Sequence, residues 1–325
     1  MMSPLILTPG EPASIAPEIT AKAWTALKTT QPFCVIGDVD HLHQRCKEYD
    51  FTKIANASDA ALHFKTSIPV LHRPLPAQSV AGQLTSKNSH WVIAAIEEAV
   101  ALCLAGDASG LVTNPIQKET LYDVGFKFQG HTDFLASLAK CQGQEVMMLV
   151  GADLRAVPIT IHIPLSEVPK TLTTAEIVAQ GKTVAAALQK YFGISDPRIA
   201  VTGLNPHAGE NGTMGHEDQT IVLPAVLELR AAGLSVLGPL PADTAFHPEA
   251  RATYDAILCM YHDQALIPAK TLDFHGGVNV TLGLPFIRTS PDHGTALSLA
   301  GTGKANPSSL IAAIKLAASM AAHNA

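Results

Sequence analysis

Short apolar runs alternate with long helical patterns along almost the whole of this chain. The apolar runs at residues 5–8, 33–37, 110–113, 146–150, 157–161, 199–204 and 256–260 have the length and composition of buried strands. Apolar residues recur at helical spacing in residues 18–27, 39–48, 88–105, 174–192, 218–232 and 307–322. Strands that alternate with helices usually pair in parallel under a helical cover. The sequence therefore predicts an α/β fold with a mostly parallel sheet.

Composition limits the classes of protein to consider. The chain has 325 residues, of which 47% are hydrophobic and 15% charged, so it is long enough for two domains with extensive cores. Its net charge is −6 without a basic run, and we expect no nucleic-acid partner. Neither an export signal nor an apolar run of membrane-spanning length is visible, and the five cysteines lack C-x-x-C spacing. These features predict a cytoplasmic protein with reduced thiols and no membrane partner.

Three histidines lie directly after predicted strands. They are His162 in T-I-H-I-P-L, His207 in G-L-N-P-H-A-G-E and His262 in M-Y-H-D-Q. The carboxyl ends of parallel strands share one edge of a sheet, where ligands bind. Three neutral imidazoles can hold a divalent metal and leave a position open for substrate. The alternative is that each ring only makes a structural hydrogen bond.

Two further segments carry groups that suit an anionic ligand. Residues 130–133, G-H-T-D, precede a helical pattern, so the free amides at its start, with His131 and Thr132, could receive a phosphate. An ordinary helix cap is the alternative there. Lys270, Asn279 and Arg288 lie near the third histidine among glycines, and the two cations suggest binding of a carboxylate or phosphate. The alternative is that each of these two cations is a solvated surface charge, but the neighbouring glycines would let a ligand approach the backbone.

Two loops near the C-terminus, residues 289–296 and 301–307, consist of small residues and open onto the last helical pattern. Such loops can wrap a nucleotide with backbone amides and hydroxyl groups. No strand is followed by G-x-G-x-x-G and a helix, so an ordinary Rossmann cofactor site is disfavoured.

Taken together, the motifs resemble the 4-hydroxythreonine-4-phosphate dehydrogenase family of pyridoxal phosphate synthesis. The likeness follows the chain from residue 5 to the last helix and is carried by T-P-G-E-P, G-H-T-D-F, H-I-P-L, G-L-N-P-H-A-G-E, G-P-L-P-A-D-T, Y-H-D-Q, G-V-N-V-T-L-G-L-P-F-I-R-T-S and D-H-G-T-A. The resemblance implies two α/β/α domains with an isopropylmalate-dehydrogenase-like fold and an interdomain cleft. We place a cofactor-side domain at residues 1–125 plus 283–325, and a metal, substrate and dimerisation domain at residues 126–282.

The resemblance also assigns roles to particular residues. It implies NAD or NADP as oxidant, one divalent cation (zinc, cobalt, magnesium or manganese), and a homodimer whose active site lies at the interface. The matching positions are His162, His207 and His262 for the metal, with one ligand from the partner subunit; His131, Thr132, Lys270, Asn279 and Arg288 for the substrate; and, less securely, Ser290, Asp292, Gly294, Thr295 and Asn306 for the cofactor.

The implied reaction is oxidation of 4-phosphooxy-L-threonine at C3, followed by decarboxylation to 3-amino-2-oxopropyl phosphate. Lys270 or Asp263 is the candidate general base. Asn114 and Gln117 occupy positions where Gly and His are frequent in the family. They keep open a related dehydrogenase that acts on another four-carbon hydroxy acid phosphate or on a diol acid. A zinc hydrolase built on the same histidines and a catalytically silent dimer are further alternatives.

Overall fold

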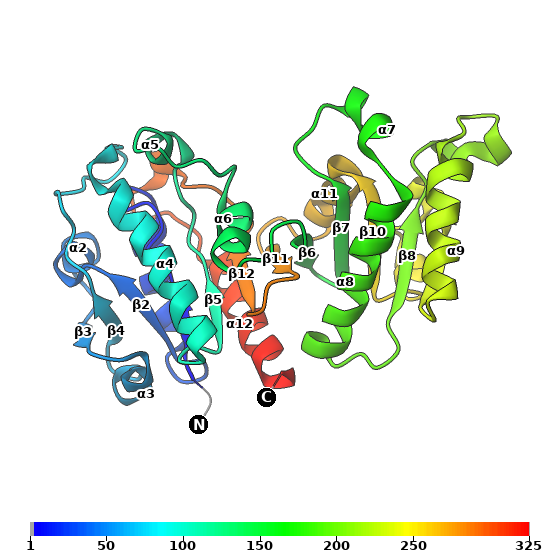
Figure 1. Cartoon of the computed structure of the whole chain (residues 1–325). Coiled ribbons are helices and arrows are strands. Elements are labelled where there is room, and N and C mark those ends of the chain that lie inside the picture. The colour runs from blue at the N-terminus through cyan, green and yellow to red at the C-terminus, as the bar shows by residue number, and fades with distance from the viewer. Residues whose placement is uncertain (1–2, 325) are drawn as a thin grey trace. The chain divides into compact units, whose positions relative to one another are not determined.

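The computed structural model describes residues 3–324, which form two compact α/β units (Figure 1). Unit 1 comprises residues 3–145 together with Leu284–His323. Unit 2 comprises Val146–Gly283, so its whole sequence is inserted between two parts of unit 1.

Unit 1 is built on a parallel sheet with the strand order β3-β4-β2-β1-β5-β12. Its elements are β1 (Leu5–Leu7), α1 (Ala16–Leu27), β2 (Phe33–Gly37), α2 (Val39–Arg45), β3 (Phe51–Ile54), α3 (Ala60–His63), β4 (Ile68–His72), α4 (Ser89–Ala105), β5 (Gly110–Val112), α5 (Lys118–Tyr122), α6 (His131–Leu138), β12 (Arg288–Pro291) and α12 (Ser308–His323).

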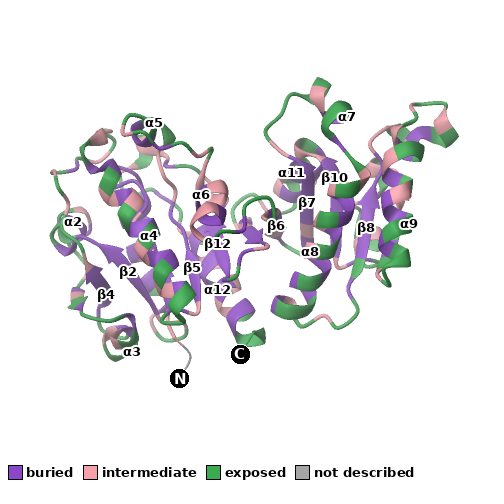
Figure 2. Ribbon diagram, viewed as in Figure 1, coloured by how far each residue is buried: buried purple, intermediate pink, exposed green. Residues whose placement is uncertain are grey.

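The core of unit 1 follows from the alternation of side chains along its strands. Ile6, Ile36 and Leu111 belong to one buried cluster with the apolar residues of α4, which covers that face. Leu5 and Leu7 are buried on the opposite side, where α12 packs on β1, β5 and β12 and also contacts α1. The strands are therefore covered on both faces, and Figure 2 shows them buried beneath helices whose outer sides are exposed.

The first domain boundary lies later in the chain than residue 125. Phe126 and Phe134 belong to the same buried cluster as α4, and their rings contact each other with centroids 5.1 Å apart. This apolar packing fixes residues 126–145 to unit 1, and the chain passes to unit 2 only after Glu145. The chain returns to unit 1 after Gly283.

Unit 2 has the strand order β11-β6-β7-β10-β8-β9. β11, β6 and β7 pair antiparallel, whereas β7, β10, β8 and β9 pair in parallel. Its elements are β6 (Val146–Gly151), β7 (Leu154–Thr160), α7 (Val168–Thr171), α8 (Thr174–Phe192), β8 (Arg198–Thr202), a π-helical turn (Asp218–Val222), α9 (Leu223–Ala231), β9 (Ser235–Leu240), α10 (Pro248–Arg251), β10 (Ala256–Tyr261), α11 (His262–Leu272) and β11 (Val278–Leu282).

Helices also cover both faces of the sheet of unit 2. Ala156, Ala200 and Ile257 form one buried cluster with apolar residues of α11. α8 and α9 pack together, and a Cβ added at Gly181 of α8 would come within 2.9 Å of Leu229. Gly181 therefore allows α9 to approach α8 closely.

The sequence-based expectations for the thiols agree with the structure. All five cysteines are free and buried. Burial raises the pKa of Cys34, Cys46 and Cys103 to about 12, so these thiols stay protonated. Among the residues that the structure describes, no helix is long and apolar enough to cross a membrane.

Candidate active site

The three histidine-bearing strands are neighbours in unit 2, in the order β7-β10-β8 (Figure 1). Tyr261, the last residue of β10, pairs with Thr160, the last residue of β7. His262 and His162 therefore leave the same edge of the sheet, and their ring centroids are 5.6 Å apart. The structure brings these two imidazoles together as the sequence predicts.

The first turn of α11 fixes the orientation of His262. Its Nδ1 forms a hydrogen bond of 2.7 Å with Oδ1 of Asp263. A carboxylate at Nδ1 favours the tautomer that carries its proton there, which leaves the Nε2 lone pair for a metal. The exposed Asp263 thus acts on the imidazole of His262. Lys270 lies on the same helix, eight residues after His262 and about 12 Å from it along the helix axis.

His207 is presented by an unusual turn, Pro206–Gly212, that follows β8. Five successive residues, from His207 to Asn211, have positive φ angles between 42° and 81°. The left-handed conformation costs about 1–2 kcal/mol for each residue with a side chain, so the surroundings must hold this turn in place. His207 does not join the pair formed by His162 and His262. Within residues 3–324 of a single chain, no three His, Cys, Asp or Glu side chains are grouped to hold a metal.

Three basic side chains surround the start of α6 in unit 1. Arg288 of β12 is buried, and its Nε and Nη2 donate to Oγ1 of Thr113 at 3.2 and 2.7 Å. Lys118 begins α5, and a Cβ added at Gly130 would lie 3.9 Å from its Nζ. His131 is the first residue of α6, and its buried Nε2 has no hydrogen-bond partner among the described residues.

The electrostatics of this group are those of an anion site. Burial lowers the pKa of Arg288 to about 10, which still leaves the guanidinium charged near neutral pH. Burial, and then the positive charges of Arg288 and Lys118, lower the pKa of His131 well below its usual value, so this ring is neutral. Gly130 is the N-cap residue of α6, and no side chain caps the helix. Thr132 therefore does not serve as an ordinary helix cap, which was the other interpretation of this motif. The first amides of the helix can therefore receive a ligand.

The remaining sequence-predicted residues are placed as follows. Asn279 lies on β11 in unit 2, and its buried Oδ1 lacks a hydrogen-bond partner among the described residues. In unit 1, Ser290 lies on β12, and the amide of Asp292 donates to Oγ of Ser309. Asn306 accepts from the amide and hydroxyl of Ser308 at the start of α12. A Cβ at Gly294 would meet open space, so this position leaves room beside the backbone.

Two side-chain contacts hold these loops, and one of them comes from Lys22, which the sequence did not single out. Thr295 donates to Oε1 of Gln117 at 3.0 Å, which ties the first loop to the start of α5. Lys22 of α1 donates to the carbonyl oxygens of Gly303 and Ala305 at 2.7 and 2.8 Å. A lysine on a helical pattern gives no sequence signal of such a contact, because only the fold brings the loop to it.

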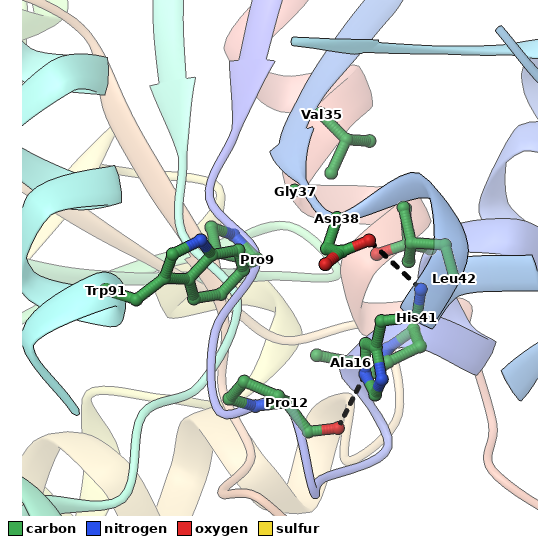
Figure 3. Close-up of a pocket in the computed structure, with 11 residues that line it drawn as sticks. Pro9, Pro12, Ala16, Val35, Gly37, Asp38, His41, Leu42 and Trp91 are labelled. Carbon is green, nitrogen blue, oxygen red and sulfur yellow. Dashed lines mark hydrogen bonds between the residues drawn. The ribbon is translucent and has the colours of Figure 1, made fainter. Parts of the chain in front are cut away.

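A small cavity lies at the carboxyl ends of β1 and β2 (Figure 3). Its volume is about 20 Å³, which is room for one water molecule and not for a cofactor. Oδ1 of Asp38 beside it caps α2 by accepting from the amides of Asp40 and His41, and Oδ2 accepts from the amide of Leu75, so both carboxylate oxygens are occupied. An acidic residue after the second strand holds the ribose in a Rossmann site, whereas here it is committed to the backbone.

The sequence matches the family described as pyridoxal phosphate biosynthetic protein PdxA over residues 28–317. The chain belongs to the PdxA family. A 4-hydroxythreonine-4-phosphate dehydrogenase from Caulobacter vibrioides is 51% identical over 325 residues, which cover 98% of each chain. The crystal structure of a 4-hydroxythreonine-4-phosphate dehydrogenase from Klebsiella pneumoniae has a TM-score of 0.89 and 37% identity, and covers 98% of this chain and 99% of that one.

A more distant structure defines the fold type. A β-decarboxylating dehydrogenase from Thermococcus kodakarensis has a TM-score of 0.50 at 15% identity, covering 98% of this chain and 82% of that one. The expected isopropylmalate-dehydrogenase-like α/β fold is confirmed by this likeness and by the PdxA structure. PdxA family membership makes the chain an oxidoreductase with a nicotinamide cofactor.

Proposed function

We propose that the chain oxidises 4-phosphooxy-L-threonine at C3 with NAD or NADP, and that the resulting keto acid loses carbon dioxide to give 3-amino-2-oxopropyl phosphate. The observation that carries this proposal is the group formed by Lys118, His131 and Arg288 at the first turn of α6. Two cations and a neutral imidazole suit a phosphate dianion, which the substrate of the related dehydrogenases carries.

Unit 1 supplies the groups for the phosphate. Arg288, held by Thr113, contributes a fixed charge, and Lys118 contributes a second charge on a flexible stem. His131 offers a ring nitrogen without another partner in the described chain, and Thr132 adds a hydroxyl beside it. Holding the phosphate at one end orients the C3 hydroxyl for reaction.

Unit 2 supplies imidazoles that fit a divalent metal. The rings of His162 and His262 suit two metal ligands, and Asp263 holds Nδ1 of His262 so that Nε2 can face the metal. We assign the third position to His207 of a second copy of the chain. A divalent cation held there (zinc, cobalt, magnesium or manganese) would act as a Lewis acid on the oxygen atoms of the substrate.

The remaining steps are assigned to residues of this chain. We assign the removal of the C3 hydroxyl proton to Lys270, whose amine can accept a proton when it is uncharged, and the positioning of His262 to Asp263. The buried Oδ1 of Asn279 can accept a hydrogen bond from the substrate's amino group. Loss of carbon dioxide follows because the new ketone takes up the electron pair of the breaking bond.

The nicotinamide cofactor is assigned to the loops of residues 289–296 and 301–307 in unit 1. Ser290, Asp292, Gly294, Thr295 and Asn306 are the proposed contacts. The hydrogen bonds from Thr295 to Gln117 and from Lys22 to Gly303 support this assignment, because they hold both loops in a defined conformation. Preformed loops reduce the entropy that is lost when a dinucleotide binds.

A homodimer fits the apolar surface of unit 2. Ile267 and Phe274 are 64% and 74% exposed, and Ile267 lines a groove of about 400 Å³ together with Phe246 and Pro268. Exposed apolar side chains next to a groove are typical of an interface between protein chains. Light scattering of the purified protein should give twice the mass of 34.2 kDa, and Phe274→Asp should shift it toward the monomer.

The reaction is tested by mixing the purified protein with 4-phosphooxy-L-threonine, NAD or NADP, and each metal in turn. Growth of reduced-cofactor absorbance together with release of carbon dioxide is the expected result. A hydrolase or a silent dimer would give no reduced cofactor. Equal rates with the unphosphorylated analogue would contradict the assignment of the α6 group and favour a related dehydrogenase for diol acids.

A further inference from the structure

The left-handed turn that carries His207 is attached to a single buried carboxylate. Asp218 is 2% exposed and begins the π-helical turn Asp218–Val222. Its Oδ1 accepts from the amide of Leu204 at 2.7 Å, and its Oδ2 accepts from the amide and Nδ2 of Asn205, each at 3.0 Å. These are the residues that lead from β8 into the turn, so Asp218 fixes the point where the turn begins.

The turn also packs closely against Asp218. A Cβ added at Gly203 would lie 2.7 Å from Cα of Ala208 and 2.8 Å from Oδ1 of Asp218. A Cβ added at Gly209 would lie 3.2 Å from Cβ of Asp218. The turn therefore folds back over the carboxylate, and its position depends on this contact.

The need for such an anchor comes from the backbone of the turn. Side-chain-bearing residues in the left-handed region relax when nothing holds them. Asn205 makes a further hydrogen bond, from its Nδ2 to Oε2 of Glu217 at 2.9 Å. The two backbone amides that lead into the turn, those of Leu204 and Asn205, both donate to Asp218. A π-helical turn is rare and is often found at functional sites.

We propose that Asp218 is a positioning residue, which fixes the left-handed turn so that the imidazole of His207 is held ready for the metal. The inference rests on the proposed function, in which His207 is a ligand. Asp218 itself does not touch the metal. Its loss should allow the turn to relax and the third ligand to become mobile, while the pair formed by His162 and His262 is retained.

The test compares Asp218→Asn with His207→Ala and with a matched control, Asp38→Asn. Asp38 is likewise a buried carboxylate that accepts from three hydrogen-bond donors, and it lies in unit 1. Zinc and cobalt are titrated into the metal-free full-length protein, and the visible spectrum of bound cobalt reports the ligand geometry. Limited proteolysis of residues 206–215 reports the mobility of the turn.

Asp218→Asn should weaken metal binding by about 10- to 100-fold, change the cobalt spectrum and speed cleavage in the turn. Asp38→Asn should leave all three readouts unchanged even if it lowers thermal stability. Wild-type affinity in Asp218→Asn, with weakened binding in His207→Ala, would overturn this proposal and leave the proposed function standing. Unchanged binding in His207→Ala would instead overturn the ligand assignment on which it rests.

A second variant covers the case in which Asp218→Asn does not fold. Asn205→Ala removes the Nδ2 hydrogen bonds to Asp218 and Glu217 and keeps both backbone hydrogen bonds to Asp218, and Glu217→Gln serves as the control for the contact with Glu217. A severalfold loss of metal affinity in this folded variant supports the proposal. Full affinity with an unchanged cobalt spectrum counts against it.

Discussion

Replacing Glu18 by glutamine would leave the guanidinium of Arg45 buried without its counter-charge. The two side chains are 8% and 6% exposed, and Nη2 of Arg45 lies 2.6 Å from Oε1 of Glu18. The same oxygen accepts from the amide of Gly301 at 2.7 Å, so the carboxylate also holds the loop of residues 301–307. Breaking a buried pair by removing one charge costs about 3–5 kcal/mol.

The expected loss lies near the lower end of that range. Arg45 keeps its hydrogen bonds to the carbonyl oxygens of Pro12 and Ser14, and a cavity of about 180 Å³ beside the pair can admit solvent. A loss of about 3 kcal/mol corresponds to a fall in Tm of roughly 6–12 °C for a unit of this size. Differential scanning calorimetry of the variant and the wild type measures it.

A double replacement tests the electrostatic reasoning. Oε2 of Glu18 and Nε of Arg45 have no hydrogen-bond partner in the described chain, so the pair is only partly compensated. Replacing both residues by methionine removes the desolvation costs of both charges. The double variant should therefore lose less stability than the sum of the losses in Glu18→Met and Arg45→Met. A fall in Tm of less than about 1 °C in Glu18→Gln, or additive losses in the double variant, would refute the reasoning.

Three further outcomes are expected. The pKa of His131 in the folded protein lies well below its usual 6.5, so on acidification the imidazole is protonated in the unfolded chain before it is protonated in the folded one. The stability that this residue contributes above pH 6.5 is therefore lost as the pH falls below that value. The free energy of unfolding should accordingly fall less steeply toward about pH 5 in His131→Gln than in the wild type, and parallel slopes would contradict this. Lys118→Met should raise KM for the phosphorylated substrate about tenfold while KM for the cofactor stays constant, and equal rises in both would argue against a phosphate contact. The buried thiols, among them Cys34, Cys46 and Cys103 with pKa values raised to about 12, should not react with a thiol reagent until the protein is denatured. Fast labelling of the native protein would show that their burial is not maintained.

The sequence predicted β1, β2, β5, β6, β7, β8 and β10 and missed β3, β4, β9, β11 and β12. The runs that became β1, β2, β5, β7, β8 and β10 are short and apolar because both of their faces are covered. β3 and β9 are the outermost strands of their units and are partly exposed, and β9 contains Gly238 and Pro239. Edge strands tolerate such residues and show a weaker pattern, so they were not predicted. β4 was also missed, since Pro69 interrupts its apolar run.

The sequence could predict which residues lie at the end of each strand, but not the detailed geometry of the site. That prediction was enough to bring His162 and His262 together, because it depends only on parallel neighbours. It could not reveal the left-handed backbone at His207, which is held by hydrogen bonds from Leu204 and Asn205 to the side chain of Asp218. It also could not place Lys118, since only the packing of α5 near Gly130 brings its ammonium group beside His131.

The insertion of unit 2 within unit 1 sets an order for folding on the ribosome. β12 pairs with β5, and α12 packs on β12, but both are encoded after the whole of unit 2. During synthesis the nascent first half has an open sheet edge at β5, which only the last part of the chain can cover. Because exposed edges promote aggregation, a truncated product that ends before β12 should depend on chaperones far more than the complete protein does.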